Sequence, residues 1–177
     1  MTRVFSVKEF KFCSDSFAVL KKINLKEIGF NKIAGSNLYI YQSNEYKLLN
    51  YSIKPKVIFL INIEDDNIYM KLQDINIKNL PNIFKTLSLD IEVNIFPEGN
   101  FYRIIRHISL SYDGNNKLIR YLSENFINKL LNNLIEIISK RFDKKLIKKF
   151  LKSINLDQWF KKFPKKIKIN FLEFIFN

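Results

Sequence analysis

Apolar residues recur at steps of three and four along the last third of the chain. They are Phe126, Ile127, Leu130, Leu131, Leu134, Ile135 and Ile138. This spacing lines one face of an α-helix. Ser123 precedes the run as an N-cap, and no Gly or Pro interrupts it before Pro164. The pattern predicts a long helix between Ser123 and Trp159.

The apolar positions of the second half of this helix lie at a different angle from those of the first half. They are Phe142, Leu146, Ile147, Phe150, Leu151 and Ile154. A straight helix cannot bury both sets against one flat surface, so we expect a bend or wrap near Ser139 to Phe142.

Before the helix, the chain shows the alternation and turn residues of β-strands. The clearest case is Leu89, Ile91, Val93 and Ile95, which alternate with polar residues and precede the turn Pro97 to Asn100. The predicted strands are Val4–Phe12, Ile28–Ile33, Asn37–Gln42, Tyr46–Ile53 (ended by Pro55), Lys56–Ile63, Ile68–Ile77, Leu89–Ile95 and Phe101–Tyr112, with a short helix at Phe17–Ile23.

A meander of strands followed by one long helix predicts an α+β helix-grip fold. In this fold a curved antiparallel sheet of about six or seven strands wraps around a long C-terminal helix. Such folds commonly leave an apolar cavity between the sheet and the helix.

Length and composition fit one domain with a substantial core: the chain has 177 residues, of which 47% are hydrophobic. We expect the domain to span residues 1–160, and residues 161–177 to be a basic and then hydrophobic C-terminal extension. The longest wholly apolar run, Val57 to Ile61, is too short to cross a bilayer, and the N-terminus lacks the apolar core of a signal peptide. The expected location is the cytoplasm or an organelle stroma, with peripheral membrane contact as an option.

The net charge of +13 indicates an anionic partner, but part of this charge reflects codon bias. Lys, Ile and Asn are abundant, and an AT-rich genome encodes many proteins with this composition because the codons of these residues contain mostly A and T. Residues 140–168 nevertheless hold 12 basic and 2 acidic residues. Either this segment is a solvated helix face, or it contacts an anionic membrane or, less favourably, nucleic acid. The candidate contact residues are Lys140, Arg141, Lys144, Lys145, Lys148, Lys149, Lys152 and Trp159.

Little in the sequence points to catalysis. It has no Gly-rich phosphate loop, metal-ligand spacing or nucleophile elbow, and a lone Cys13 excludes a disulfide framework. His107, Arg103 and Ile105 alternate along the last predicted strand, so their side chains lie on the same face of the sheet. If that face is the concave one, they line a ligand cavity; if it is not, His107 is a surface histidine. Asp90 and Glu92 share a face, and cross-strand pairing explains them without catalysis.

Several segments resemble the START/polyketide-cyclase superfamily of helix-grip proteins, and within it an uncharacterised family of cyanobacteria and plastids. The matching segments are Ile53-Lys54-Pro55-Lys56-Val57, Ile75-Asn76-Ile77, Asn125 through Ile138 to Lys140-Arg141-Phe142, and the ending Asp157-Gln158-Trp159. The resemblance implies no catalytic residues.

Three functions follow as hypotheses. The first is non-enzymatic binding of a hydrophobic ligand (a lipid, a pigment or an isoprenoid-like molecule) between the sheet and the helix. The second is peripheral binding of an anionic membrane or nucleic acid through residues 140–168. The third is a cyclase-like enzyme using His107 with nearby carboxylates. No metal or other cofactor is predicted, and the pattern leaves the oligomeric state open.

Overall fold

Eight strands and one long helix make up the described part of the chain. The structure, a computed structural model, describes residues 2–13, 25–26, 29–48, 51–65, 67–78, 86–99, 101–112 and 123–153. The strands are β1 (Thr2–Cys13), β2 (Phe30–Lys32), β3 (Leu38–Gln42), β4 (Tyr46–Leu48), β5 (Tyr51–Glu64), β6 (Asn67–Lys78), β7 (Leu87–Glu98) and β8 (Phe101–Tyr112), and the helix is α2 (Glu124–Ser153). The predicted helix at Phe17–Ile23 and the extension 161–177 lie outside the described residues.

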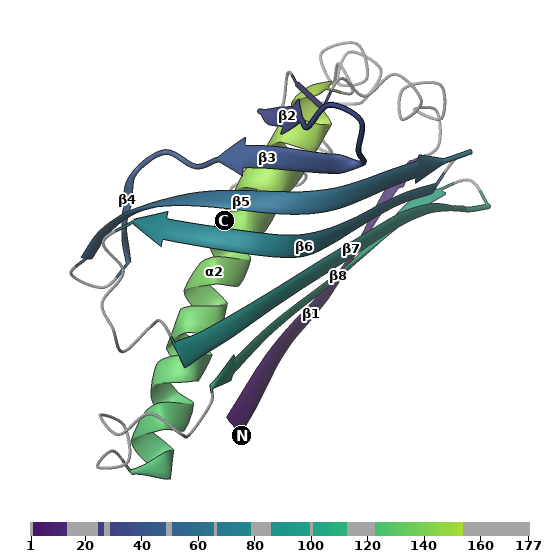
Figure 1. The fold of residues 1–177 in the computed structure, drawn as a ribbon. Helices are drawn as coiled ribbons and strands as arrows, with labels where there is room; N and C mark the ends of the chain where they lie inside the picture. The colour runs from purple at the N-terminus through teal and green to yellow at the C-terminus, as the bar shows by residue number, and fades with distance from the viewer. Residues whose placement is uncertain are drawn as a thin grey trace.

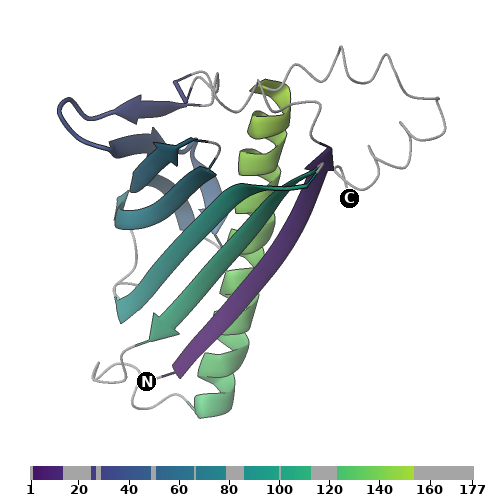
Figure 2. The same ribbon diagram turned by 90° about the vertical axis from the view of Figure 1, so that its right-hand side faces the viewer.

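The strands form one antiparallel sheet in the order β1-β8-β7-β6-β5-β3-β2, with β4 paired to β5. Figures 1 and 2 show the sheet curving around α2, which crosses its concave face. This architecture confirms the predicted α+β helix-grip fold. No helix in the described ranges is both long enough and apolar enough to cross a bilayer.

The core lies between α2 and the inner face of the sheet. Alternating residues of the central strands are almost wholly buried there, because successive side chains of a strand point to opposite faces. The most deeply buried of them include Met70, Val93, Ile95 and Ile108, and Leu131 and Leu134 of α2 pack into the same cluster. Phe126, predicted to be part of the inner stripe, is 51% exposed at the start of the helix.

The N-terminus of α2 is capped as predicted. The Ser123 side-chain Oγ accepts a hydrogen bond from the backbone N–H of Phe126 at 3.3 Å, and the Ser123 carbonyl accepts from Phe126 and Ile127. These bonds satisfy donors that have no partner within the helix.

The bend expected near Ser139 to Phe142 is absent, and α2 is one continuous helix that Figure 2 shows as nearly straight. The expectation assumed a flat partner surface. In the curved sheet, Phe142 packs toward Phe59 of β5 at 6.4 Å between ring centroids, while Ser139 and Asp143 contact Arg106 of β8. A straight helix can therefore bury side chains at different angles, because strands surround it on more than one side.

Two strand boundaries also differ from the sequence prediction. Tyr46–Ile53 was expected to be one extended piece ended by Pro55, but Tyr46–Leu48 pairs with Tyr51–Ile53 as separate antiparallel strands. Pro55 lies buried inside β5. A proline is tolerated there because the pairing of β5 with β3 ends at Lys56, one residue away.

Candidate functional site

The inner face of β8 contains one charged residue among apolar ones. Tyr102, Ile104, Arg106 and Ile108 follow in steps of two, and all are buried. Arg106 is only 2% exposed. An arginine is almost never buried so completely unless it is paired, so its partners define the polar centre of the molecule.

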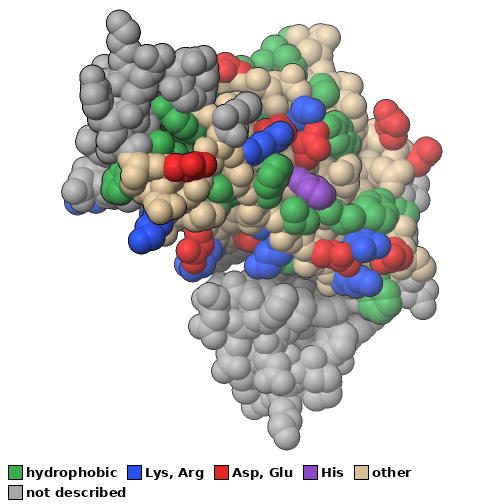
Figure 3. Space-filling view, turned by 90° about the horizontal axis from the view of Figure 1, so that it is seen from below, with side chains coloured by type: hydrophobic (Ala, Val, Ile, Leu, Met, Phe, Trp, Pro, Cys, Tyr) green, Lys and Arg blue, Asp and Glu red, His purple; other side chains and the backbone are tan. Residues whose placement is uncertain are grey.

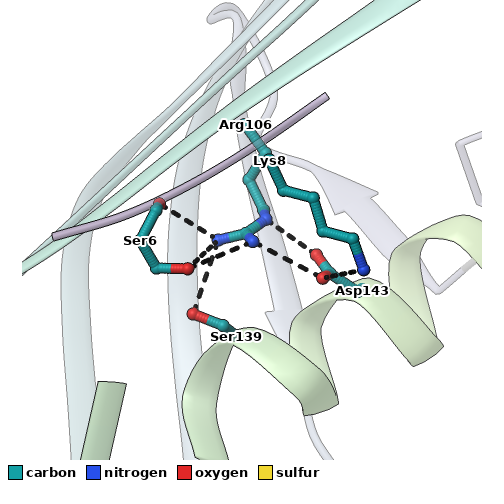
Figure 4. A network of polar contacts seen from close by, with 5 residues as sticks. All are labelled: Ser6, Lys8, Arg106, Ser139 and Asp143. Carbon is teal, nitrogen blue, oxygen red and sulfur yellow. Dashed lines mark hydrogen bonds and ion pairs between the residues drawn. The ribbon is translucent and has the colours of Figure 1, made fainter. Parts of the chain in front are cut away.

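Arg106 links the sheet to the helix (Figure 4). Its Nε lies 2.7 Å from Asp143 Oδ1, and its terminal nitrogens lie within hydrogen-bonding distance of the Ser6 and Ser139 hydroxyls at 3.3–3.4 Å. Lys8 Nζ approaches the other oxygen of Asp143 at 3.5 Å. Three elements, β1, β8 and α2, thus meet at one guanidinium.

The electrostatics of this cluster reflect its burial. Removal from water lowers the pKa of Arg106 and raises the pKa of the Asp143 carboxyl, while each charge of the pair opposes the shift of the other. An arginine keeps its proton in proteins, so Arg106 itself does not act as a general acid or base. Arg106 and Lys8 face one carboxylate, and the cluster therefore carries one surplus positive charge.

A groove with a volume of about 450 Å³ lies at the β2–β3 end of the sheet. Its lining combines apolar side chains (Leu25, Phe30, Tyr39, Ile63) with Asn31 and two lysines, Lys26 and Lys32. The volume is within the range of small-molecule sites, roughly 300–1,000 Å³.

An aromatic row leads from this groove to the helix. The Phe30 ring lies 5.9 Å from Phe59, and the Phe59 ring lies 6.4 Å from Phe142 of α2. Tyr41 flanks Phe30 at 5.2 Å. The groove therefore adjoins the space between sheet and helix through a wall of aromatic side chains.

A second feature of the concave side is the separation of β6 from β7. These strands pair only over Ile68–Lys71 and Glu92–Ile95, whereas β7 and β8 pair along their whole length. Farther beyond the paired part, several apolar residues are only partly buried; they include Ile77 of β6, Leu87 and Leu89 of β7, and Ile127 and Leu130 of α2. Figure 1 shows α2 passing behind the point where the strands diverge.

The predicted cavity residues His107, Arg103 and Ile105 lie in the opposite phase of β8, facing away from α2. His107 is exposed, and Figure 3 shows the histidine at the surface among acidic and basic side chains. Arg103 pairs on the same face with Glu9 at 2.9 Å and with Glu98 at 3.0 Å. Of the two alternatives that the sequence left open, the structure fits the surface histidine and not the cavity residues, because the buried residues Tyr102, Ile104 and Ile108 occupy the side of β8 that faces the helix.

The acidic residues of β7 lie on the outer face as well. Glu92 is paired in register with Lys71, whose Nζ lies 2.8 Å away, and it accepts a hydrogen bond from the Tyr69 hydroxyl at 3.0 Å. The hydrogen bond from Lys71, aided by Tyr69, lowers the pKa of the Glu92 carboxyl. Cross-strand pairing therefore accounts for Glu92, as the sequence predicted.

The described half of the predicted basic face is divided between structural contacts and solvent. Arg141 donates to the Lys47 carbonyl at 3.3 Å and Lys145 to the Ser43 hydroxyl at 3.0 Å, which ties α2 to β4 and to the segment that precedes it. Lys140 pairs with Glu136 at 2.6 Å but stays 75% exposed, and Lys144 is exposed. Lys148, Lys149 and Lys152 belong to α2, but their side chains are not among those described, and Trp159 lies outside the described residues.

Sequence reasoning missed Arg106 and Asp143. A usable signal was present: Leu131, Ile135, Ser139 and Asp143 follow at steps of four, so two polar residues continue an apolar stripe of the helix. Arg106 likewise interrupts the apolar phase of β8. An acidic residue on the apolar face of the helix and an arginine on the apolar face of the strand together predict a buried ion pair.

No group of three potential metal-ligating side chains occurs within the described ranges.

Solved structures place the chain in a fold class. The Zhui aromatase/cyclase from Streptomyces sp. R1128 matches with a TM-score of 0.53 at 6% identity, covering 88% of this chain and 95% of the other. A protein of unknown function from Staphylococcus aureus matches with a TM-score of 0.52 at 9% identity, covering 89% and 98%.

At these identities the likeness concerns the fold alone, which is the helix-grip. No protein-family model and no curated protein sequence matches the chain. The resemblance to a cyanobacterial and plastid family therefore stays a prediction from the sequence.

Proposed function

We propose that the protein binds a hydrophobic small molecule on the concave side of the sheet, in the groove at the β2–β3 end and along the aromatic row toward α2. The observation that carries this proposal is the groove itself, whose apolar floor of Leu25, Phe30 and Tyr39 adjoins the helix through Phe59. Ligand pockets of this kind are mostly apolar with a few polar groups that orient the ligand.

The two lysines of the groove narrow the class of ligand. Lys26 and Lys32 stand beside the apolar floor, and Lys32 Nζ lies 5.9 Å from the centre of the Tyr39 ring. A molecule with an apolar body and an acidic group would pair its charge with these ammonium groups. We therefore favour an acidic lipid or isoprenoid-like acid over a neutral one.

Titration with a fluorescent fatty acid, 11-(dansylamino)undecanoic acid, tests the proposal. Ile63 is 46% exposed in the groove, so Ile63→Glu adds a negative charge there at little cost to folding. Binding should weaken by about tenfold or more, since the new carboxylate repels the carboxylate of the probe and offsets the positive charge of the two lysines. The matched control is Val7→Glu, which places the same side chain at an exposed position of β1.

Equal binding by the wild type and Ile63→Glu would contradict the groove as the site. Native mass spectrometry of freshly purified protein gives an independent measurement, in which a bound apolar molecule is expected. A chain that neither carries nor takes up such a molecule would refute the proposal as a whole.

A second function, binding to an anionic membrane through the basic half of α2, is favoured by the exposure of Lys140 and Lys144. Each Lys near an anionic surface contributes about 1 kcal/mol, and salt screens the attraction. Replacing both residues by Gln should reduce sedimentation with phosphatidylserine vesicles at low salt. Replacing Lys54 and Lys56, which are exposed on β5, is the matched control. Equal loss in both pairs would mean that net charge, rather than this helix face, controls the binding.

A further inference from the structure

The edge of the sheet formed by β1 has no strand beside it in the described part of the chain. All twelve residues of β1 pair with β8 on one side, and β1 ends the strand order on the other. Figure 2 shows β1 along the border of the sheet. A free edge of this length offers backbone N–H and C=O groups to another strand.

The outer face of this edge is apolar at its centre and charged at its ends. Phe5 is 65% exposed and Val7 is 60% exposed, which makes them the two most exposed large hydrophobic side chains described. Arg3 precedes them and Glu9 follows them in the same phase. The Arg3 guanidinium lies over the Phe5 ring at 5.0 Å, so the positive charge borders the apolar pair directly.

This order of residues is complementary to itself when reversed. In an antiparallel pair of identical strands, facing residues must lie on the same face of the sheet. Moving the centre of the pair by one residue therefore changes the residue that faces any given position by two. With Ser6 opposite Ser6 of a second copy, Phe5 faces Val7 and Arg3 faces Glu9, each pair occurring twice. Centring the pair on Val7 would set Arg3 against Lys11, and centring it on Phe5 would set Arg3 against Val7.

We infer that the protein forms a homodimer in which β1 of one copy pairs antiparallel with β1 of a second copy about a two-fold axis at Ser6. The pairing closes both free edges with backbone hydrogen bonds. It buries Phe5 of each copy against Val7 of the other, and it adds two Arg3–Glu9 ion pairs. A two-fold interface needs a patch that complements itself, and this edge has one.

The inference is independent of the proposed ligand site, which lies at the β2–β3 end of the sheet, opposite to β1 in the strand order. The lysine that β1 directs to the inner side, Lys8, keeps its contact with Asp143 within its own copy. Dimer formation and ligand binding can therefore be measured separately.

Charge reversal at the two ends of the patch tests both the interface and its register. Sedimentation velocity over a concentration series should show a dimer for the wild type. Arg3→Glu and Glu9→Arg should each weaken self-association by about tenfold, because both ion pairs become repulsive at once. An equimolar mixture of these two variants should restore the dimer as a heterodimer, since every facing pair is then again of opposite charge.

Lys11→Glu is the control, because it reverses a charge on the same strand and face outside the Arg3–Glu9 pairs. It should leave the dimer unchanged. Circular dichroism checks each variant for folding, which matters for Glu9 because it also pairs with Arg103. A wild type that is monomeric at all concentrations would overturn the inference, and so would a mixture that associates no better than its separate components.

Discussion

At the scale of single residues, the decisive feature is one buried arginine. Arg106 ties β1, β8 and α2 together through Ser6, Ser139 and Asp143. A buried ion pair is weak evidence for net stability, because desolvation of both charges offsets their attraction. The pair also favours one rotation of the helix on the sheet, the one that brings Asp143 to Arg106.

Replacing one partner of this pair should be far more costly than replacing both. Arg106→Met leaves the Asp143 carboxylate buried beside Lys8 alone, and it should lower the free energy of unfolding by about 3–5 kcal/mol. The double variant Arg106→Met with Asp143→Leu removes both charges and should recover most of the loss. Urea denaturation followed by circular dichroism measures each change.

Arg103→Met serves as the control for this cycle. Arg103 is also ion-paired, with Glu9 and Glu98, but on the outer face, where water screens the charges, so its loss should lower the free energy of unfolding far less than the loss of Arg106. If the losses from Arg106→Met and Asp143→Leu simply add in the double variant, the two side chains do not act as a pair.

At the scale of elements, α2 and the sheet determine each other's shape. The first half of the helix buries Leu131, Leu134 and Ile135 in the core, and the second half places Phe142 toward β5 and Asp143 toward β8. A straight helix does this because the sheet curves around it. The side-chain bonds from Arg141 and Lys145 then hold the β4 region against the helix.

The start of α2 should depend measurably on its cap. Ser123→Ala removes the Oγ that accepts the Phe126 N–H, and it should reduce the free energy of unfolding by about 1 kcal/mol. The measurement is the midpoint of urea unfolding. Ser88→Ala, at an exposed position of β7, is the comparison, and an equal shift in both variants would argue against a capping role for Ser123.

At the scale of the whole molecule, the two ends of the strand order have different surfaces. The β2–β3 end has an apolar groove with two lysines, which suits a small acidic amphiphile. The β1 end has a self-complementary edge, which suits a second copy of the chain. Because the strands between them separate the two ends, a dimer would leave both grooves open to ligand.

The sequence by itself determined the element order, the helix with its cap and the alternation of β7, because these depend on spacing along the chain. From that order the helix-grip fold followed, since a meander and one long helix must cover each other's apolar faces. The pairing of Glu92 was also predictable, because strands joined in a meander place charged residues of one face opposite each other.

Only the tertiary structure decided which phase of β8 is concave and how the helix lies. Both phases of β8 contain apolar residues and an arginine, so local pattern alone did not separate Arg106 from Arg103. The sequence-based bend in α2 failed for a similar reason: curvature belongs to the assembled sheet, and no segment encodes it locally. Burial of Arg106, and with it the polar centre of the molecule, arises from residues 100 and 37 positions apart meeting at one point.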